Sequence, residues 1–332
     1  MEWLARLRSA IVRIGREPKG AAEAALRDGR AAIAAREPED DQEVLAWAWY
    51  AIAEACQLRS EAVEQQHALE RAAEHARAAG DLALEVEVLT RSAPAIIYGA
   101  VSVEEGMRYV DRILERLGHD PAVHGLALHI RGHLRARLGE FDGAIEEIIE
   151  WRSRFRELGQ EMLYAMTAGC VADVCSWAED WAGGERALRE SYELLEGMGE
   201  RGFFSSCASA LGEAVYRQGQ IDEAEQLSVV SEEFGARDDR FNEASWRAVR
   251  AKVRAARGDF EQAESLAREA VEIAVETDYF ELAAAAWLDL AEILQAAGHA
   301  DVATPAHEAL VLYERKGNIV GAGRAKALLE TA

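Results

Sequence analysis

Apolar side chains recur at the spacing of an amphipathic helix along almost the whole chain. An early stripe comprises Trp3, Leu4, Leu7, Ile11 and Ile14. A later stripe comprises Ala263, Leu266, Ala267, Ala270 and Ile273. Residues three and four apart share one face of a helix, so each stripe is a surface that packs on a neighbour. Val and Ile are scattered and form no alternating runs, and the pattern therefore predicts an all-α protein.

The predicted helices are separated by short turns that recur in one register. Corresponding turn residues are Phe141, Trp181, Ile221, Phe260 and Ala300, which lie 40, 40, 39 and 40 residues apart. A fixed period in this range is typical of a solenoid, in which each unit packs only on its neighbours. The sequence predicts a right-handed α-solenoid of helix pairs with about 40 residues per repeat. Such a fold offers an extended surface rather than an enclosed reaction site.

We expect an N-terminal helical pair in residues 1–40, a repeat array in 41–318 and a capping helix in 319–332. The pair comprises helices over 2–14 and about 20–36. First helices of the repeats are predicted near 42–58, 82–97, 121–138, 161–178, 201–218, 240–257 and 279–297. Second helices are predicted near 61–79, 103–117, 142–158, 183–198, 222–235, 261–276 and 301–316.

Local sequence supports several of these boundaries. Asp41 follows a break in the apolar pattern and is placed to cap the next helix. Ser102 and Glu105 form a capping-box pattern, in which each side chain binds the other residue's backbone N–H. Asp278 and Glu281 form a variant of it, so we expect Asp278 to cap the helix that it precedes.

The turn register resembles the tetratricopeptide pattern. The small residues at the middle of the first helices are Gly132, Ala172, Gly212, Ala251 and Ala291. Alanines early in the second helices are Ala144, Ala224 and Ala263. The period of about 40 exceeds the 34 residues of the standard repeat, so longer helices are expected.

Residues 186–330 carry a more specific resemblance. Its clearest stretch is Trp246-Arg247-Ala248-Val249-Arg250-Ala251-Lys252-Val253, and others lie at 192–195, 199–202, 257–260, 267–271, 289–292 and 312–318. These stretches resemble the C-terminal tetratricopeptide-like arm of bacterial signalling proteins that carry an AAA-type ATPase module, a class III adenylate/guanylate cyclase domain, or both. The resemblance implies a helical arm and transfers no catalytic residue to this chain.

Charge and cysteine content narrow the choice of partners and location. The net charge of −23 argues against nucleic acid, because phosphate binding needs clustered Lys and Arg. Residues 1–36 carry eight basic and four acidic side chains, so a basic end precedes a body of net charge −27. That end is either a solvated face or a surface for a second copy of the chain. Four scattered cysteines fit a reducing cytoplasm, and no apolar run approaches the ~20 residues of a membrane span.

Motifs for catalysis or cofactor binding are absent from the sequence. None of the four lysines has a P-loop setting, and no His-Glu-x-x-His or Gly-x-Ser-x-Gly occurs. His129 and His133 lie four residues apart and share a helix face, so they could hold a metal ion with a third ligand from a neighbouring repeat. Asp173 is the best-placed third ligand. We favour the alternative, in which these are polar groove residues, and expect no metal, no cofactor and no enzymatic activity.

One row of polar residues defines the expected binding groove. Eight residues before each turn residue, the row reads His133, Asp173, Glu213, Lys252 and Glu292. Positions in the middle of the first helices face the concave side of a tetratricopeptide array. The remaining groove candidates are His129, Trp177, Tyr216 and Arg217, since aromatic and Arg side chains are common at binding hot spots. Simple solvation of an open groove would explain the same row.

The leading hypothesis is a non-catalytic scaffold that binds a protein or peptide in its concave groove. The alternative is a regulatory or sensor arm that controls an attached or partner ATPase or cyclase. This alternative follows from the resemblance alone.

Overall fold

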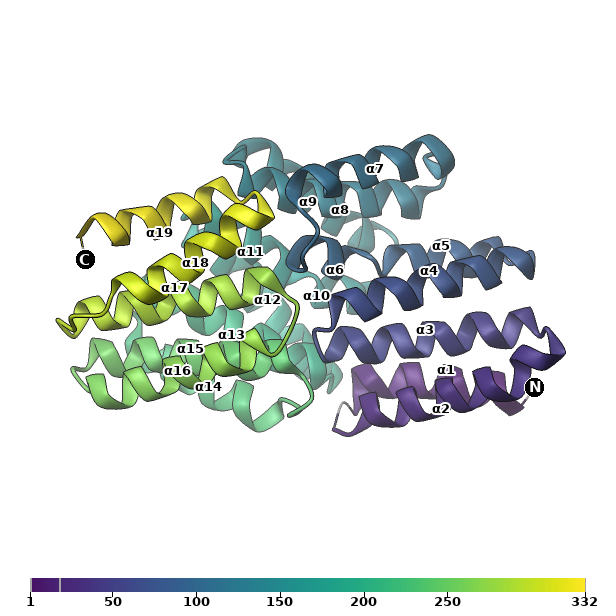
Figure 1. Ribbon diagram of the computed structural model, residues 1–332, viewed down its shortest axis with the longest axis horizontal. Coiled ribbons are helices and arrows are strands. Elements are labelled where there is room, and N and C mark those ends of the chain that lie inside the picture. Colours follow the sequence, from purple (N-terminus) through teal and green to yellow (C-terminus); the bar gives the residue numbers. More distant parts are fainter. Residues whose placement is uncertain (1, 18, 332) are drawn as a thin grey trace.

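The computed structural model describes residues 2–17 and 19–331, which form helices and turns with no strand among them (Figure 1). Helices account for 83% of the described residues, far above the roughly one-third of ordinary globular domains. The predicted all-α solenoid is confirmed.

The helices form the expected pairs. The N-terminal pair is α1 (Glu2–Arg16) and α2 (Ala21–Arg36), followed by the short 3-10 helix η1 (Glu37–Glu39). First helices of the repeats are α3 (Gln42–Leu58), α5 (Leu82–Thr90) with α6 (Ala93–Tyr98), α8 (Pro121–Arg137), α10 (Glu161–Met166) with α11 (Ala168–Trp177), α13 (Gly202–Arg217), α15 (Arg240–Ala256) and α17 (Phe280–Ala296). Second helices are α4 (Ala62–Ala78), α7 (Val103–Leu117), α9 (Phe141–Glu157), α12 (Trp181–Met198), α14 (Ile221–Phe234), α16 (Phe260–Val275) and α18 (Ala303–Lys316). The last helix is α19 (Ile319–Thr331).

Two first helices are broken where the sequence predicts one continuous helix. The helix expected over 82–97 divides into α5 and α6, because Pro94 at the start of α6 cannot donate a backbone hydrogen bond to the preceding turn. The helix expected over 161–178 divides at Thr167, whose hydroxyl donates to the carbonyl of Tyr164. All other predicted helix ends agree with the structure within two residues.

The proposed boundary near residue 40 coincides with a change of backbone direction. Asp40 has a left-handed conformation, and the Asp41 side chain accepts a hydrogen bond from the Val44 amide at the start of α3. Helix α2 packs directly on α3, and α1 contacts both α3 and α13. The basic N-terminal helices therefore pack on their own chain, and Arg6 pairs with Asp28 at 2.6 Å. Residues 1, 18 and 332 of the proposed end segments lie outside the described residues.

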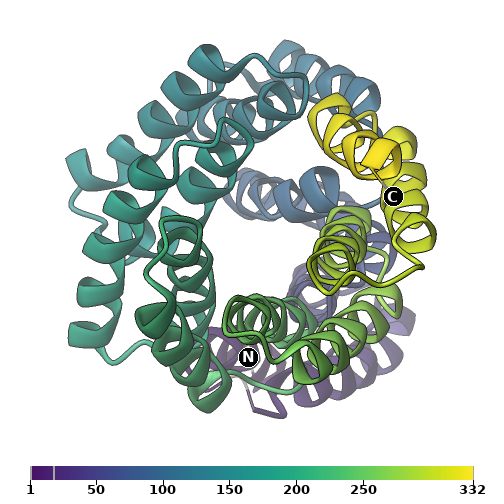
Figure 2. The same cartoon turned by 90° about the vertical axis from the view of Figure 1, so that its left-hand side faces the viewer.

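The array winds into a superhelix whose later repeats pack on its earlier ones. Viewed along the long axis, the helices encircle a common centre, with the yellow C-terminal helices against the blue ones (Figure 2). Helix α17 contacts α6, and α19 contacts α8. One apolar cluster joins Ala62 and Ala95 to residues of α15–α18, and another joins Leu128 and Ala136 to residues of α17–α19. These contacts, remote in sequence, supplement the nearest-neighbour packing of a simple solenoid.

Asp278 has a different role from the one predicted. Its carboxylate accepts hydrogen bonds from the Ala62 and Val63 amides at the start of α4, the latter at 2.9 Å. No side chain caps α17, whose N-cap residue is Tyr279. The prediction that Asp278 caps its own helix was wrong, because the superhelix brings the unpaired amides of α4 within reach of the same carboxylate.

The turn before α12 differs from three other turns at its left-handed position. Gly139, Gly219 and Gly258 occupy this position in three turns, with φ of 79°, 82° and 81°. In the turn after α11 the residue is Glu179, with φ of 58°. A side chain with a Cβ atom is strained in this region of backbone conformation.

Replacing Glu179 with Gly should therefore raise the free energy of unfolding by about 1 kcal/mol, by removing that strain. The control is Glu179→Ala, which removes the same charge and keeps a Cβ atom. Urea denaturation of the three proteins gives the comparison. Equal stability of the Gly and Ala variants would show that the turn carries no strain.

Helix α19 should stabilise the end of the array. Leu328 and Leu329 are half-buried, Ala322 and Ala325 are buried, and Arg324 donates to the carbonyls of Ser176 and Trp177. Truncation after Asn318 should lower the unfolding free energy by at least about 1.5–3 kcal/mol, the share expected from two half-buried leucines. Thermal denaturation and sedimentation measure the effect. A truncated protein that stays monomeric with an unchanged Tm would contradict a capping role.

Candidate functional site

One contact between repeats two apart shows where the inner face of the superhelix lies. Arg217 of α13 approaches Glu292 of α17 at 3.4 Å, although α15 lies between these helices in the array. Side chains from repeats two apart converge only on the inside of a curved array. This contact therefore identifies the inner face of α13, α15 and α17.

The second half of the row forms one charged cluster around Lys252, which we call the Lys252 cluster. The Lys252 ammonium lies 2.6 Å from a Glu213 carboxylate oxygen and 2.9 Å from Asp289. Arg217 donates to Glu213 at 2.8 Å. Lys252 is only 6% exposed, so its charge depends on these carboxylates. Asp289 was not among the residues selected from the sequence, because it lies outside the row that the turn register defines.

The Lys252 cluster contains more negative than positive charge. Its carboxylates are Glu213, Asp289 and Glu292, and its cations are Lys252 and Arg217. Burial alone would raise the pKa of Glu213, but Lys252 and Arg217 outweigh burial and hold it at about 2. Burial raises the pKa of Asp289 to about 6 despite the neighbouring Lys252. The cluster can therefore accept a further proton or cation near Asp289.

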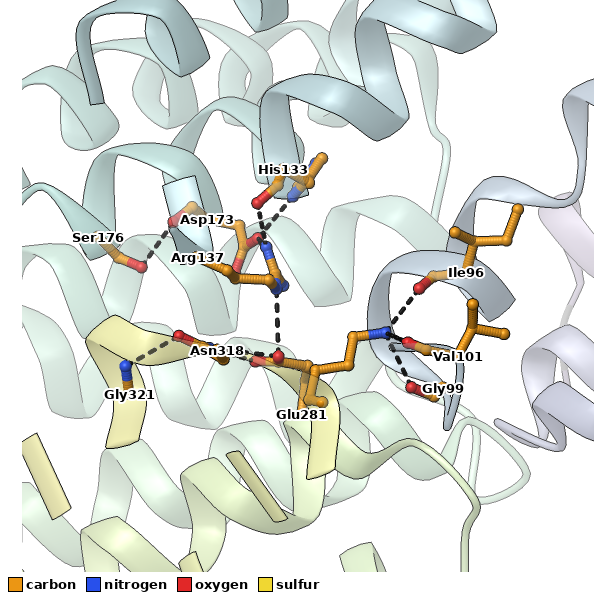
Figure 3. A network of polar contacts seen from close by, with 11 residues as sticks. Ile96, Gly99, Val101, His133, Arg137, Asp173, Ser176, Glu281, Asn318 and Gly321 are labelled. Carbon is orange, nitrogen blue, oxygen red and sulfur yellow. Dashed lines mark hydrogen bonds and ion pairs between the residues drawn. The ribbon is translucent and has the colours of Figure 1, made fainter. Parts of the chain in front are cut away.

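The first half of the row forms a second cluster, centred on Arg137 (Figure 3). His133 Nδ1 lies 2.7 Å from Asp173 Oδ2, and Arg137 donates to the same oxygen at 3.3 Å. The Arg137 guanidinium also pairs with Glu281 of α17 at 3.2 Å. His133 and Arg137 are both fully buried. This Arg137 cluster thus links α8 and α11 to a helix that comes more than 100 residues later.

Residues from the end of α18 complete the link between the two parts of the array. The Asn318 amide donates to both oxygens of Glu281, at 3.2 and 3.1 Å. The Lys316 ammonium donates to the carbonyls of Ile96, Gly99 and Val101 at 2.6, 2.9 and 2.6 Å (Figure 3). The Ile96 carbonyl belongs to the last turn of the short helix α6, and the Gly99 and Val101 carbonyls follow that helix, so all three lack intrahelical partners.

The sequence did not identify Arg137, Glu281, Lys316 and Asn318 as residues that connect distant helices. The only available signal was the position of Arg137 and Lys316 at the ends of predicted helices, where a charge ordinarily faces water. Their partners lie on helices remote in sequence, so only the superhelical closure reveals them.

The predicted groove residues differ in their access to a ligand. His133 and Lys252 are buried, and Trp177, 8% exposed, lies beneath the guanidinium groups of Arg137 and Arg324. The accessible members are Asp173, Glu213, Arg217 and Glu292, with side chains 24%, 24%, 30% and 36% exposed, together with the half-buried Tyr216 and His129. The ring of His129 stacks on Trp151, with centroids 3.9 Å apart.

The fold is shared by tetratricopeptide-repeat proteins of known structure. A Rap protein complexed with competence and sporulation factor has a TM-score of 0.60 and 14% identity, over 88% of this chain and 87% of that one. The apo form of RapI has a TM-score of 0.50 and 13% identity, over 86% of this chain and 99% of that one. Yeast Tom70 has a TM-score of 0.51 and 15% identity, over 98% of this chain. This chain spans only 64% of the length of Tom70. At these identities the similarity establishes a tetratricopeptide-like α-solenoid and nothing finer.

No protein-family model matches the chain, and no curated protein matches it in sequence. Among the described residues, every helix is too short or too polar to cross a lipid bilayer.

Acid should weaken the Arg137 cluster through Asp173. Burial alone would raise the pKa of Asp173, but Arg137 and His133 hold it at about 2, below the ordinary value of about 3.9. A lowered pKa adds stability that is present above the ordinary pKa and is lost as the pH falls toward the folded value. We expect the stability difference between the wild type and Asp173→Asn to shrink by about 1 kcal/mol between pH 6 and pH 3.

Chemical denaturation at several pH values measures this difference. The control is Asp222→Asn, which removes an exposed carboxylate paired with Arg257. A difference between the wild type and Asp173→Asn that stays constant with pH would show that the Asp173 charge does not stabilise the fold.

Proposed function

We propose that the protein is a non-catalytic module that binds a peptide, or an extended segment of a protein, on the concave face formed by α11, α13, α15 and α17. The observation that carries the proposal is the row of polar side chains on successive first helices. Three of its members, Asp173, Glu213 and Glu292, keep accessible surface, as does Arg217 beside them. Spaced polar groups of this kind can bind an extended backbone and its charged side chains.

The charge balance favours a cationic ligand. Three carboxylates surround two cations in the Lys252 cluster, and the protein as a whole has a net charge of −23. An added Lys, Arg or terminal amine would offset the surplus carboxylate near Asp289. The overall charge would also attract such a ligand from a distance.

The comparisons support a binding role in general terms. The Rap protein among the structural neighbours is complexed with competence and sporulation factor, and its superhelix covers most of this chain. The similarity in fold supports the binding of a ligand by this chain. The chemistry of that ligand is inferred from the residues of the Lys252 cluster.

A peptide-display selection against the purified protein tests this proposal. Selected peptides should be enriched in Lys and Arg. Their affinity should fall at least about tenfold in Glu292→Gln, because the loss of a charged hydrogen bond weakens binding by roughly 1.5–3 kcal/mol. Raising the ionic strength should weaken binding to the wild type, since the Glu292 side chain is partly exposed.

The matched control is Glu264→Gln, which removes a carboxylate paired with Arg268 at 2.7 Å within α16. This variant loses one anion, as the concave variant does, and should bind the peptides normally. Full affinity in the concave variant, or selection of acidic peptides, would refute binding at this face.

The regulatory alternative remains a second proposal. Its support is the resemblance of residues 186–330 to the arms of ATPase and cyclase signalling proteins. In that case ligand binding at the concave face would change nucleotide turnover by an attached or partner enzyme. Co-purification from the native host together with an ATPase or cyclase, followed by activity assays with and without the selected peptide, tests this proposal.

A further inference from the structure

A group of metal-ligating side chains lies beside the Arg137 cluster. It comprises His129 and His133 from α8 and Cys170 from α11. One ligand atom from each residue lies within 4.8 Å of the others. The third ligand expected from the sequence, Asp173, is not part of this group, because its carboxylate binds His133 Nδ1.

The orientation of His133 is that of a metal-binding imidazole. Nδ1 lies 2.7 Å from the Asp173 carboxylate, and Arg137 donates to the same carboxylate. The imidazole ring is therefore held in place on its Nδ1 side. Within the described part of the chain, the buried Nε2 has no hydrogen-bond partner. A buried polar atom without a partner is unfavourable, and a histidine backed by a carboxylate is the usual arrangement at zinc sites.

We propose that His129, His133 and Cys170 bind a divalent transition-metal ion, Zn²⁺ by preference, with Asp173 as the positioning residue behind His133. Two imidazoles and a thiolate suit Zn²⁺, and Mg²⁺ or Ca²⁺ would require oxygen ligands. The three ligands leave a fourth position for water or for a donor from a bound ligand.

The site requires only a small local adjustment. Bond lengths of about 2.0 Å to nitrogen and 2.3 Å to sulfur place tetrahedral ligands about 3.3–3.7 Å apart, so the group must contract by roughly 1 Å. His129 and Cys170 are both half-buried rather than fully enclosed.

The protonation of the ligands is compatible with metal binding. Burial lowers the pKa of both histidines, so both are neutral and able to bind at neutral pH. Burial raises the pKa of the Cys170 thiol to about 12, so the metal ion must displace its proton. Each ion bound through the Cys170 sulfur therefore releases one proton, and affinity should rise with pH.

Metal titration of the purified, chelator-treated full-length protein tests the proposal, with Co²⁺ as a spectroscopic probe and Zn²⁺ as competitor. We expect one ion per chain and a sulfur-to-cobalt charge-transfer band, which Zn²⁺ abolishes. Cys170→Ala should remove the band, and His129→Gln should weaken binding at least tenfold. Asp173→Asn should retain the band and weaken binding about 10–100-fold, as expected for a residue that orients a ligand.

The controls are Cys175→Ala, a buried cysteine on the same helix, and His119→Gln, an exposed histidine near the start of α8. Both should bind cobalt like the wild type, and circular dichroism confirms that each variant is folded. Absence of stoichiometric binding, or affinity unchanged in both Cys170→Ala and His129→Gln, would overturn the proposal. These results are independent of the peptide selection, because Arg217 and Glu292 are not part of the metal group.

Discussion

The structure depends on the burial of one cation, Arg137, between carboxylates from two distant parts of the chain. Asp173 comes from the neighbouring repeat, whereas Glu281 comes from α17. A fully buried guanidinium that lost one of these partners would be destabilised by several kcal/mol, roughly 3–5 for a buried pair. The α8–α11 region therefore requires α17 to be in place. A simple solenoid is stabilised only by contacts within repeats and between neighbouring repeats. Here the Arg137 ion pairs couple early and late repeats, which favours cooperative unfolding.

The packing of the late repeats on the early ones also determines which side chains of the concave face are accessible. In an open array the polar row would be solvated, and each charge would be free to pair with a partner. Here His133 and Lys252 are buried within ion pairs, and only the margins of the Lys252 cluster remain accessible. A ligand meets side chains that are already held in place, so little ordering is required on binding. Under the proposed function, the inner face would be a pre-organised surface, with its specificity set by the charge surplus near Asp289.

The turn register and the apolar stripes were sufficient to predict the helix pairs, because both signals are local and repeat through the chain. They also placed His133, Asp173, Glu213, Lys252 and Glu292 in one row. They could not predict that these residues pair with one another, nor that Asp278 caps a helix more than 200 residues earlier. Such contacts depend on the superhelical pitch. That pitch is the sum of small rotations between many repeats. Cys170 escaped notice for the same reason, since it resembles a small buried residue until α8 and α11 are brought together.

The two clusters belong to neighbouring first helices. Asp173 on α11 and Glu213 on α13 are consecutive acidic positions of the row, and these two helices pack on each other. Each carboxylate has its own cation, Arg137 for Asp173 and Lys252 for Glu213. Both side chains are partly exposed and carry the same sign of charge. A cationic ligand that contacted both carboxylates would connect the Arg137 cluster to the Lys252 cluster. Under the proposed function, binding would then involve Asp173, which also pairs with Arg137 in the link between distant repeats, so ligand binding and the stability of the array would be coupled.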